Sequence, residues 1–128
     1  GKNIAGKAQT GSGKTAVAAA LIYTAAKNGF QSALMAPTEV LANQHYKTLC
    51  GFFGDSMKIE LLTGSVTAKN KRLIRERLEN GEADMVVGTH AVIQDSVAFS
   101  RLGLAITDEQ HRFGVTQRES IIAIKKLA

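Results

Sequence analysis

The sequence predicts an α/β fold in which a central, mostly parallel sheet carries helices on both faces. Short apolar runs alternate with longer segments of helical pattern, which is typical of parallel sheets. A glycine-rich segment, residues 8–15 (AQTGSGKT), joins the first apolar run to the first helical segment. An acidic pair, Asp108 and Glu109, follows the fifth apolar run. Because ligands bind at the carboxyl ends of strands in such sheets, both segments are expected at one edge.

Five short apolar runs are the predicted strands. They cover residues 4–8, 32–36, 58–62, 84–88 and 102–107. Pro37 closes the second run, because proline cannot donate to a strand ladder. The continuous run Met85, Val86 and Val87 predicts a strand buried on both faces. The fifth strand is predicted to end where Asp108 begins the acidic pair.

Helical patterns fill the intervals between these strands. They cover residues 14–27, 39–53 and 67–79, with a single turn at 90–95. Asparagine-glycine pairs at 28–29 and 80–81 are predicted to end the first and third helices. The expected core face of the second helix consists of Val40, Leu41, Tyr46 and Leu49.

The end of the chain carries a further helix signal. Thr116 and Glu119 have the spacing of a capping box and precede the apolar residues Ile121, Ile122 and Ile124. A helix is therefore predicted to begin there.

Composition predicts one globular domain. The 128 residues are 45% hydrophobic and 21% charged, which is enough apolar material for a core. No apolar run approaches the roughly 20 residues of a membrane span, so no membrane partner is expected. Cys50 is the only cysteine, which excludes an internal disulfide and fits a reducing cytoplasm. The net charge of +5 weakly favours an anionic partner, and a merely basic surface is the alternative.

Residues 8–15 match the phosphate-binding loop pattern except at its first glycine, where Ala8 stands. The glycines let the backbone curl so that its N–H groups face phosphate oxygens, and the following helix adds its positive dipole end. Lys14 is expected to reach the β- and γ-phosphates, and the Thr15 hydroxyl to ligate Mg²⁺. The predicted cofactors are ATP and Mg²⁺. The predicted nucleotide-binding residues are Gln9, Thr10, Gly11, Ser12, Gly13, Lys14 and Thr15.

The acidic pair supplies the second half of this chemistry. Asp108 could hold Mg²⁺, and Glu109 could orient or deprotonate the water that attacks the γ-phosphate. An Asp-Glu pair alone often marks a turn or a helix cap, and a glycine-rich turn alone is common. The two motifs in this order predict a RecA-like phosphate-loop nucleoside triphosphatase, with Lys14, Asp108 and Glu109 as catalytic residues.

From about residue 16 to residue 118 the chain resembles the first motor domain of the RecG family of bacterial DNA helicases. The strings that carry the resemblance are residues 36–45 (APTEVLANQH), 61–65 (LLTGS), 87–95 (VGTHAVIQD) and 108–115 (DEQHRFGV). The resemblance implies a bacterial cytoplasmic enzyme that couples ATP hydrolysis to branch migration and remodelling of forked or branched DNA, in repair and recombination.

The resemblance also implies roles for particular residues. Those that would touch the DNA backbone are Pro37, Thr38, Gly64, Thr89 and His90. Gln110 and His111 would couple the nucleotide state to a partner domain. Threonine hydroxyls and exposed N–H groups on short loops suit phosphate contacts, although strand-ending turns have the same composition.

The first residues depart from the RecG pattern. Residues 1–4 (GKNI) and 8–15 look instead like a DEAD-box helicase, and such proteins act on RNA. An RNA-directed ATPase is therefore one alternative. A nucleotide-binding module without catalysis is another, and in that case Lys14→Ala would change nucleotide binding with no ATPase activity to lose.

The resemblance further implies that the chain is an incomplete motor domain. It has no initiator methionine, it ends before the family's Ser/Thr-Ala-Thr motif, and it does not include the second motor domain or the wedge domain. The strand of the absent motif would separate the first and fifth strands. We expect the chain either to pair those two strands directly or to self-associate through open sheet edges, and to hydrolyse ATP slowly or not at all.

Overall fold

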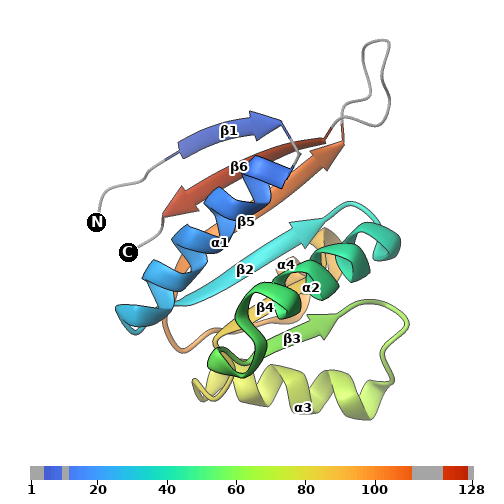
Figure 1. Ribbon diagram of the computed structural model, residues 1–128. Helices are drawn as coiled ribbons and strands as arrows, with labels where there is room; N and C mark the ends of the chain where they lie inside the picture. Colours follow the sequence, from blue (N-terminus) through green and yellow to red (C-terminus); the bar gives the residue numbers. More distant parts are fainter. Residues whose placement is uncertain (1–4, 10–11, 111–119, 127–128) are drawn as a thin grey trace.

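The computed structural model describes residues 5–9, 12–110 and 120–126, with side chains from Thr15 to Asp108 other than 95 and 96. The chain folds as the predicted α/β domain, and the described strands form one sheet in the order β1-β6-β5-β2-β4-β3 (Figure 1). The strands are β1 Ala5–Gln9, β2 Gln31–Ala36, β3 Ile59–Leu62, β4 Met85–Thr89, β5 Leu102–Gln110 and β6 Ser120–Lys126. The helices are α1 Ser12–Lys27, α2 Glu39–Phe53, α3 Ala68–Glu79 and α4 His90–Ser96, with a 3₁₀ turn at Gly54–Ser56.

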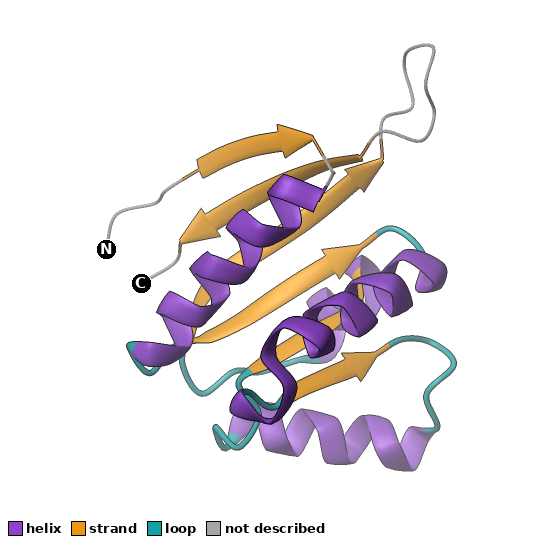
Figure 2. Cartoon of the chain, in the orientation of Figure 1, coloured by secondary structure: helices purple, strands orange, loops and turns teal. Residues whose placement is uncertain are grey.

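Strands β5, β2, β4 and β3 form the parallel part of the sheet. Alternate residues of β2 and β4 point to opposite faces, and both faces are covered. Leu34 and Val87 belong to the core under α1 and α2, whereas Ala33 and Val86 belong to the core under α3 and α4. Figure 2 shows α1 and α2 side by side across one face of the sheet. Burial on both faces explains why these strands read as continuous apolar runs.

Most of the helices begin and end close to the residues that the sequence pattern predicted. Thr38 and Thr67 cap α2 and α3, and each side chain accepts a hydrogen bond from the backbone three residues on. Gly29 and Gly81 follow α1 and α3 with φ of 81° and 84°, the left-handed conformation in which glycine ends helices. α4 confirms the short helix predicted from residue 90.

The predicted core face of α2 is wrong at Val40. Its side chain is 66% exposed, whereas Leu49 is buried and Leu41 and Tyr46 are partly buried against the core. Ala42 takes the inward position in the first turns and is fully buried. At about 100° a residue, Val40 lies nine positions before the buried Leu49 and therefore on the opposite side of the helix, in solvent.

The helix predicted after Thr116 is also wrong. Ser120–Lys126 forms strand β6, which pairs antiparallel with β1 on one side and with β5 on the other. Thr116 and Glu119 themselves lie outside the described residues. The β-branched Ile121, Ile122 and Ile124 suit a strand, and their backbone satisfies the ladders of both neighbours.

Strand β6 also corrects the expected pairing of the first and fifth strands. These strands do not pair directly, because β6 lies between them. The gap that suggested self-association is therefore filled by the chain itself. In addition, β5 continues beyond its predicted end to Gln110, since Asp108, Glu109 and Gln110 pair with β6.

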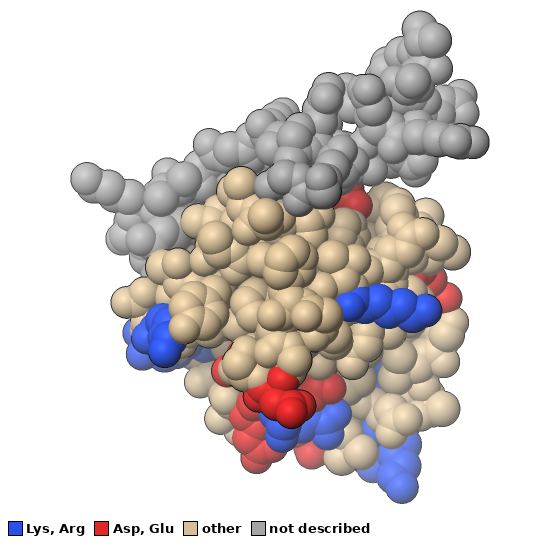
Figure 3. Space-filling model, viewed as in Figure 1, with Lys and Arg blue, Asp and Glu red and all other residues tan. Residues whose placement is uncertain are grey.

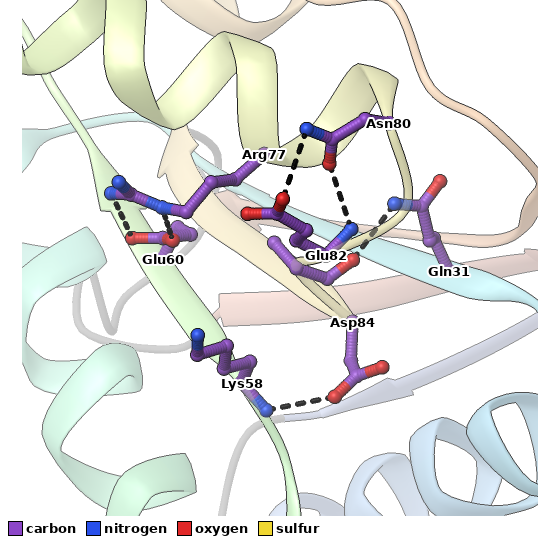
Figure 4. Close-up of polar contacts among 8 residues, drawn as sticks. Gln31, Lys58, Glu60, Arg77, Asn80, Glu82 and Asp84 are labelled. Atoms are coloured by element: carbon purple, nitrogen blue, oxygen red, sulfur yellow. Dashed lines mark hydrogen bonds and ion pairs between the residues drawn. The ribbon is translucent and has the colours of Figure 1, made fainter.

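The amino ends of the strands are held by polar contacts to the backbone (Figure 4). The buried side chain of Gln31 donates from Nε2 to the carbonyls of Leu78 and Ala83, at 2.9 and 2.8 Å, and accepts from Arg101 N–H at 2.9 Å. Asp84 accepts from Lys58 N–H at 2.8 Å. These contacts tie β2, β3, β4 and the end of α3 together at the edge opposite the carboxyl ends.

An ion pair joins α3 to β3 near the same edge. Arg77 Nη2 donates to Glu60 Oε1 at 3.1 Å, and Nε donates to the second carboxylate oxygen at 2.5 Å. The carboxylate raises the pKa of Arg77, because it stabilises the charged guanidinium.

The face of the sheet that carries α1 and α2 is largely uncharged (Figure 3). Among the described helices, none has the length and apolar composition needed to cross a bilayer.

Candidate functional site

The two predicted nucleotide motifs lie at the same edge of the sheet. Ile121 of β6 pairs with Gln9, at the end of β1, on one side and with Glu109 of β5 on the other. Ile122 likewise pairs with Ala8 and with Asp108. Since neighbouring strands are about 4.8 Å apart, the backbones of Gln9 and Glu109 are separated by roughly 10 Å. The segment that follows β1 therefore starts beside the acidic pair.

Helix α1 begins directly after that segment. Ser12, Gly13, Lys14 and Thr15 form its first turn, which contains no acidic residue. The first four N–H groups of a helix have no partner within it, and the dipole makes this end positive. The first turn of α1 thus suits an anion such as a phosphate. Thr10 and Gly11 lie outside the described residues.

Asp108 is the buried acidic group of the site, with an exposed fraction of 1%. Its Oδ2 lies 2.6 Å from Nε2 of His45, which is carried by α2 and is 16% exposed. An ionised carboxylate only accepts hydrogen bonds, so Nε2 is the donor in the tautomer that pairs with a carboxylate. The other oxygen, Oδ1, is buried and has no hydrogen-bond partner among the residues that the structure describes.

A buried carboxylate oxygen without a partner fits a site that receives a cation. An unpaired oxygen of this kind is costly unless a ligand completes it. The described residues contain no group of three or more His, Cys, Asp or Glu arranged to hold a metal. A site with a single protein carboxylate is compatible with Mg²⁺, which is commonly bound through one or two carboxylates together with substrate phosphates and water.

The five residues predicted to touch a nucleic acid all follow or end parallel strands at this same edge. Pro37 and Thr38 follow β2, Gly64 follows β3, and Thr89 ends β4 beside His90. Pro37, Thr38 and Gly64 are exposed, whereas Thr89 and His90 are partly buried. Because β2 lies between β5 and β4, this row of loops continues from Asp108 along the edge.

Glu39 joins two of these loops. As the first residue of α2, it accepts from Ser65 N–H at 2.8 Å and from the Ser65 hydroxyl at 2.6 Å. A Cβ at Gly64 would lie 3.2 Å from Glu39 Oε1, so the backbone passes close to the carboxylate. The loop after β2 and the loop after β3 are therefore held against each other by one carboxylate.

The contacts with Ser65 lower the pKa of Glu39 below its usual value of 4.5, because they stabilise the ionised form. We expect Glu39→Gln to be less stable than the wild type near neutral pH, and the difference to shrink in acid. A lowered folded-state pKa gives stability that is complete above the unfolded-state value of about 4.5 and is lost as the pH falls through the folded-state pKa. Urea midpoints at about pH 7 and about pH 3.5 measure this change. Glu79→Gln, at the exposed end of α3, is the control, and a deficit independent of pH would contradict the assignment.

Sequence reasoning gave no role to His45 or Glu39. His45 lies three residues after the buried Ala42 and four before the buried Leu49, so it occupies the inward face of α2. A polar residue at an inward helical position is the signal that could have identified it.

Gln110 ends β5, and His111 lies outside the described residues, so their predicted coupling role stays a prediction.

Comparisons with known proteins agree with this arrangement. The model of the family "DEAD/DEAH box helicase" matches residues 1–128. The ATP-dependent DNA helicases RecG of Staphylococcus aureus (strain NCTC 8325 / PS 47) and Staphylococcus epidermidis (strain ATCC 12228 / FDA PCI 1200) are each 59% identical to this chain over 109 residues. A solved structure of RecG bound to a three-way DNA junction matches with a TM-score of 0.74 at 45% identity, covering 84% of this chain and 15% of that one.

The matched segment covers 85% of this chain and 16% of the length of each RecG relative. The chain thus corresponds to a small part of those proteins, and the resemblance in the sequence strings is confirmed for that part. The family match extends over the whole chain, including the residues that depart from the RecG pattern. This chain therefore belongs to the DEAD/DEAH box helicase family.

Proposed function

We propose that this chain is the ATP-binding motor domain of a RecG-type DNA helicase or translocase. The observation that carries the proposal is the placement of Asp108, whose buried Oδ1 has no partner among the described residues, at the edge where the first turn of α1 begins. That pairing of an anion-binding helix end with a buried carboxylate suits a nucleoside triphosphate and Mg²⁺ together. The RecG relatives are named ATP-dependent DNA helicases, which supports the same reading.

In this proposal each site residue has one task. Lys14 contacts the β- and γ-phosphates, and the other nucleotide-binding residues of the loop are Gln9, Thr10, Gly11, Ser12, Gly13 and Thr15. Thr15 and Asp108 hold Mg²⁺, which supplies positive charge beside the phosphates when it is bound. Glu109 orients the attacking water and accepts its proton.

The loops at residues 37–38, 64 and 89–90 are proposed to contact the backbone of branched or forked DNA. Their position along one sheet edge, and the carboxylate of Glu39 that holds two of them together, support a shared track. The structural relative is a RecG bound to a three-way DNA junction, which supports DNA as the partner. Gln110 and His111, which follow Asp108, are proposed to couple the nucleotide state to a partner domain.

Within these 128 residues we propose ATP binding with little or no hydrolysis or unwinding. In the family that the sequence resembles, a second motor domain supplies an arginine finger. Such a group raises the rate by about 10³–10⁵ in related systems. Movement on DNA also needs two domains that shift against each other.

Nucleotide binding by the Lys14→Ala variant tests the proposal. We expect the chain to bind a fluorescent ATP analogue saturably with Mg²⁺, and the variant to bind at least about 10-fold more weakly. A hydrogen bond to a charged group is worth about 1.5–3 kcal/mol, which corresponds to roughly 10–150-fold in affinity. Fluorescence anisotropy measures both dissociation constants.

Lys27→Ala is the matched control for this experiment. Lys27 ends the same helix, is exposed, and lies over the ring of Tyr23 at 5.5 Å, far from the first turn. Its replacement should leave nucleotide affinity unchanged. Equal binding by the chain and by Lys14→Ala, or no binding by a chain with a folded circular-dichroism spectrum, would contradict the proposal.

The family match also favours one other substrate, because the family model is that of DEAD/DEAH box helicases. An RNA-directed ATPase is therefore the second candidate. Titration of the nucleotide-bound chain with a three-way DNA junction and with an RNA duplex decides between them. Tighter binding of the junction supports the DNA reading, and tighter binding of RNA supports the alternative.

A further inference from the structure

The two carboxylate oxygens of Asp108 have different surroundings. Oδ2 is 2.6 Å from Nε2 of His45, whereas Oδ1 is buried and has no hydrogen-bond partner in the described part of the chain. A carboxylate with no hydrogen bond to either oxygen can rotate about its terminal torsion angle, which has a broad energy profile. A hydrogen bond to one oxygen restricts this rotation and thereby narrows the range of directions in which the other oxygen points.

His45 is itself held firmly. The buried residues Ala42 and Leu49 lie one helical turn before and after it, and both belong to the core under α1 and α2. Glu39 anchors the start of α2, because its carboxylate accepts hydrogen bonds from the backbone N–H and the hydroxyl of Ser65. A donor on a packed helix defines the position of its acceptor better than a donor on a loop.

We propose that His45 is a positioning residue that holds Asp108 with Oδ1 directed at the divalent cation. This inference rests on the proposed nucleotide site and adds a residue that touches neither the nucleotide nor the cation. Hydrogen bonds to metal-ligating groups commonly change metal affinity by 10–100-fold when they are removed. The role of His45 is therefore visible in the dependence of nucleotide binding on Mg²⁺.

The test compares nucleotide affinity with Mg²⁺ and with EDTA. We expect His45→Ala to weaken binding of the fluorescent ATP analogue about 10–100-fold in Mg²⁺ and to leave binding in EDTA unchanged. His45→Gln keeps a donor at the end of the side chain and should recover part of the Mg²⁺ effect. Lys47→Ala, an exposed residue two positions along α2, is the control and should behave as the wild type.

A double variant separates positioning from general damage. If His45 acts through Asp108, His45→Ala adds little further loss in a chain that already carries Asp108→Ala. Thermal unfolding of each variant shows whether the fold is kept. Equal loss in Mg²⁺ and EDTA, or no loss in either, would overturn the proposal.

The two proposals can fail separately. If the wild-type chain binds no nucleotide, the proposed function fails, and His45 is then tested by direct Mn²⁺ titration followed by electron paramagnetic resonance. Weaker Mn²⁺ binding by His45→Ala than by Lys47→Ala would still support the positioning role. Equal Mn²⁺ binding by these two variants, or none by the wild type, would overturn it.

Discussion

Replacing Gly88 with alanine should lower the free energy of unfolding by about 4 kcal/mol or more, enough to unfold a marginal domain. A Cβ at this buried position in β4 would lie 2.0 Å from the carbonyl oxygen of Leu62 and 3.0 Å from Cδ1 of Ile93. The Leu62 oxygen is part of the backbone of β3, so it cannot turn aside as a side chain could. The strands would have to separate, and the ladder between them would be lost. Circular dichroism and urea unfolding measure the effect.

Gly51 provides the matched control. It lies near the end of α2, and a Cβ there would meet nothing within 4 Å. Alanine at this position should stabilise the chain by about 0.5–1 kcal/mol, because glycine is a poor helix former. A Gly88→Ala variant with the same urea midpoint as the wild type would show that β3 and β4 can separate without penalty.

The effect at Gly88 also bears on the site. Gly88 pairs with Leu62, and the next residues of the two strands are Thr89 and Thr63. Close approach at Gly88 therefore fixes the loops after β3 and β4 relative to each other. Glu39 fixes the loop after β2 against the loop after β3 through Ser65. The close backbone approach at Gly88 and the carboxylate of Glu39 thus fix the loops at the sheet edge that is proposed to contact DNA.

The parallel part of the fold could be predicted because its signals are local. Each strand from β2 to β5 is a short apolar run, and the longer helices between them, α2 and α3, each have a side-chain cap and a glycine close to their ends. The position of Asp108 followed from the rule that parallel strands present their carboxyl ends together. No knowledge of the sheet order was needed for these predictions.

Strand β6 could not be predicted in the same way. The capping-box spacing of residues 116 and 119 predicts a helix, but this signal lies in a stretch of only four residues. The β-branched isoleucines that follow suit a strand equally well. The observed choice depends on the backbone groups of β1, at the other end of the chain, and of β5, the preceding strand, which both need partners. Local signals carry no information about that requirement.

The contact between His45 and Asp108 was missed for a related reason. The two residues are 63 positions apart, and their pairing requires the rotation of α2 about its axis to be known. Leu41 and Leu49, four residues before and after His45, were both predicted to face inward, but no local signal links a histidine on that face to a strand far away in sequence. Once Ala42 and Leu49 define the inward face, His45 falls between them and the contact follows.

Replacing Gln31 with leucine is expected to lower the free energy of unfolding by roughly 2–4 kcal/mol, because the change removes three hydrogen bonds to the backbone, two of them buried. Gln94→Leu, at an exposed position in α4, should stay within about 0.5 kcal/mol of the wild type. Urea unfolding measures both variants, and a Gln31→Leu chain as stable as Gln94→Leu would contradict the expectation. Gln31 lies at the amino end of β2, opposite the proposed site, so nucleotide affinity should be unchanged while the chain is folded. Binding should instead be lost at a lower temperature, which separates damage to the scaffold from damage to the site.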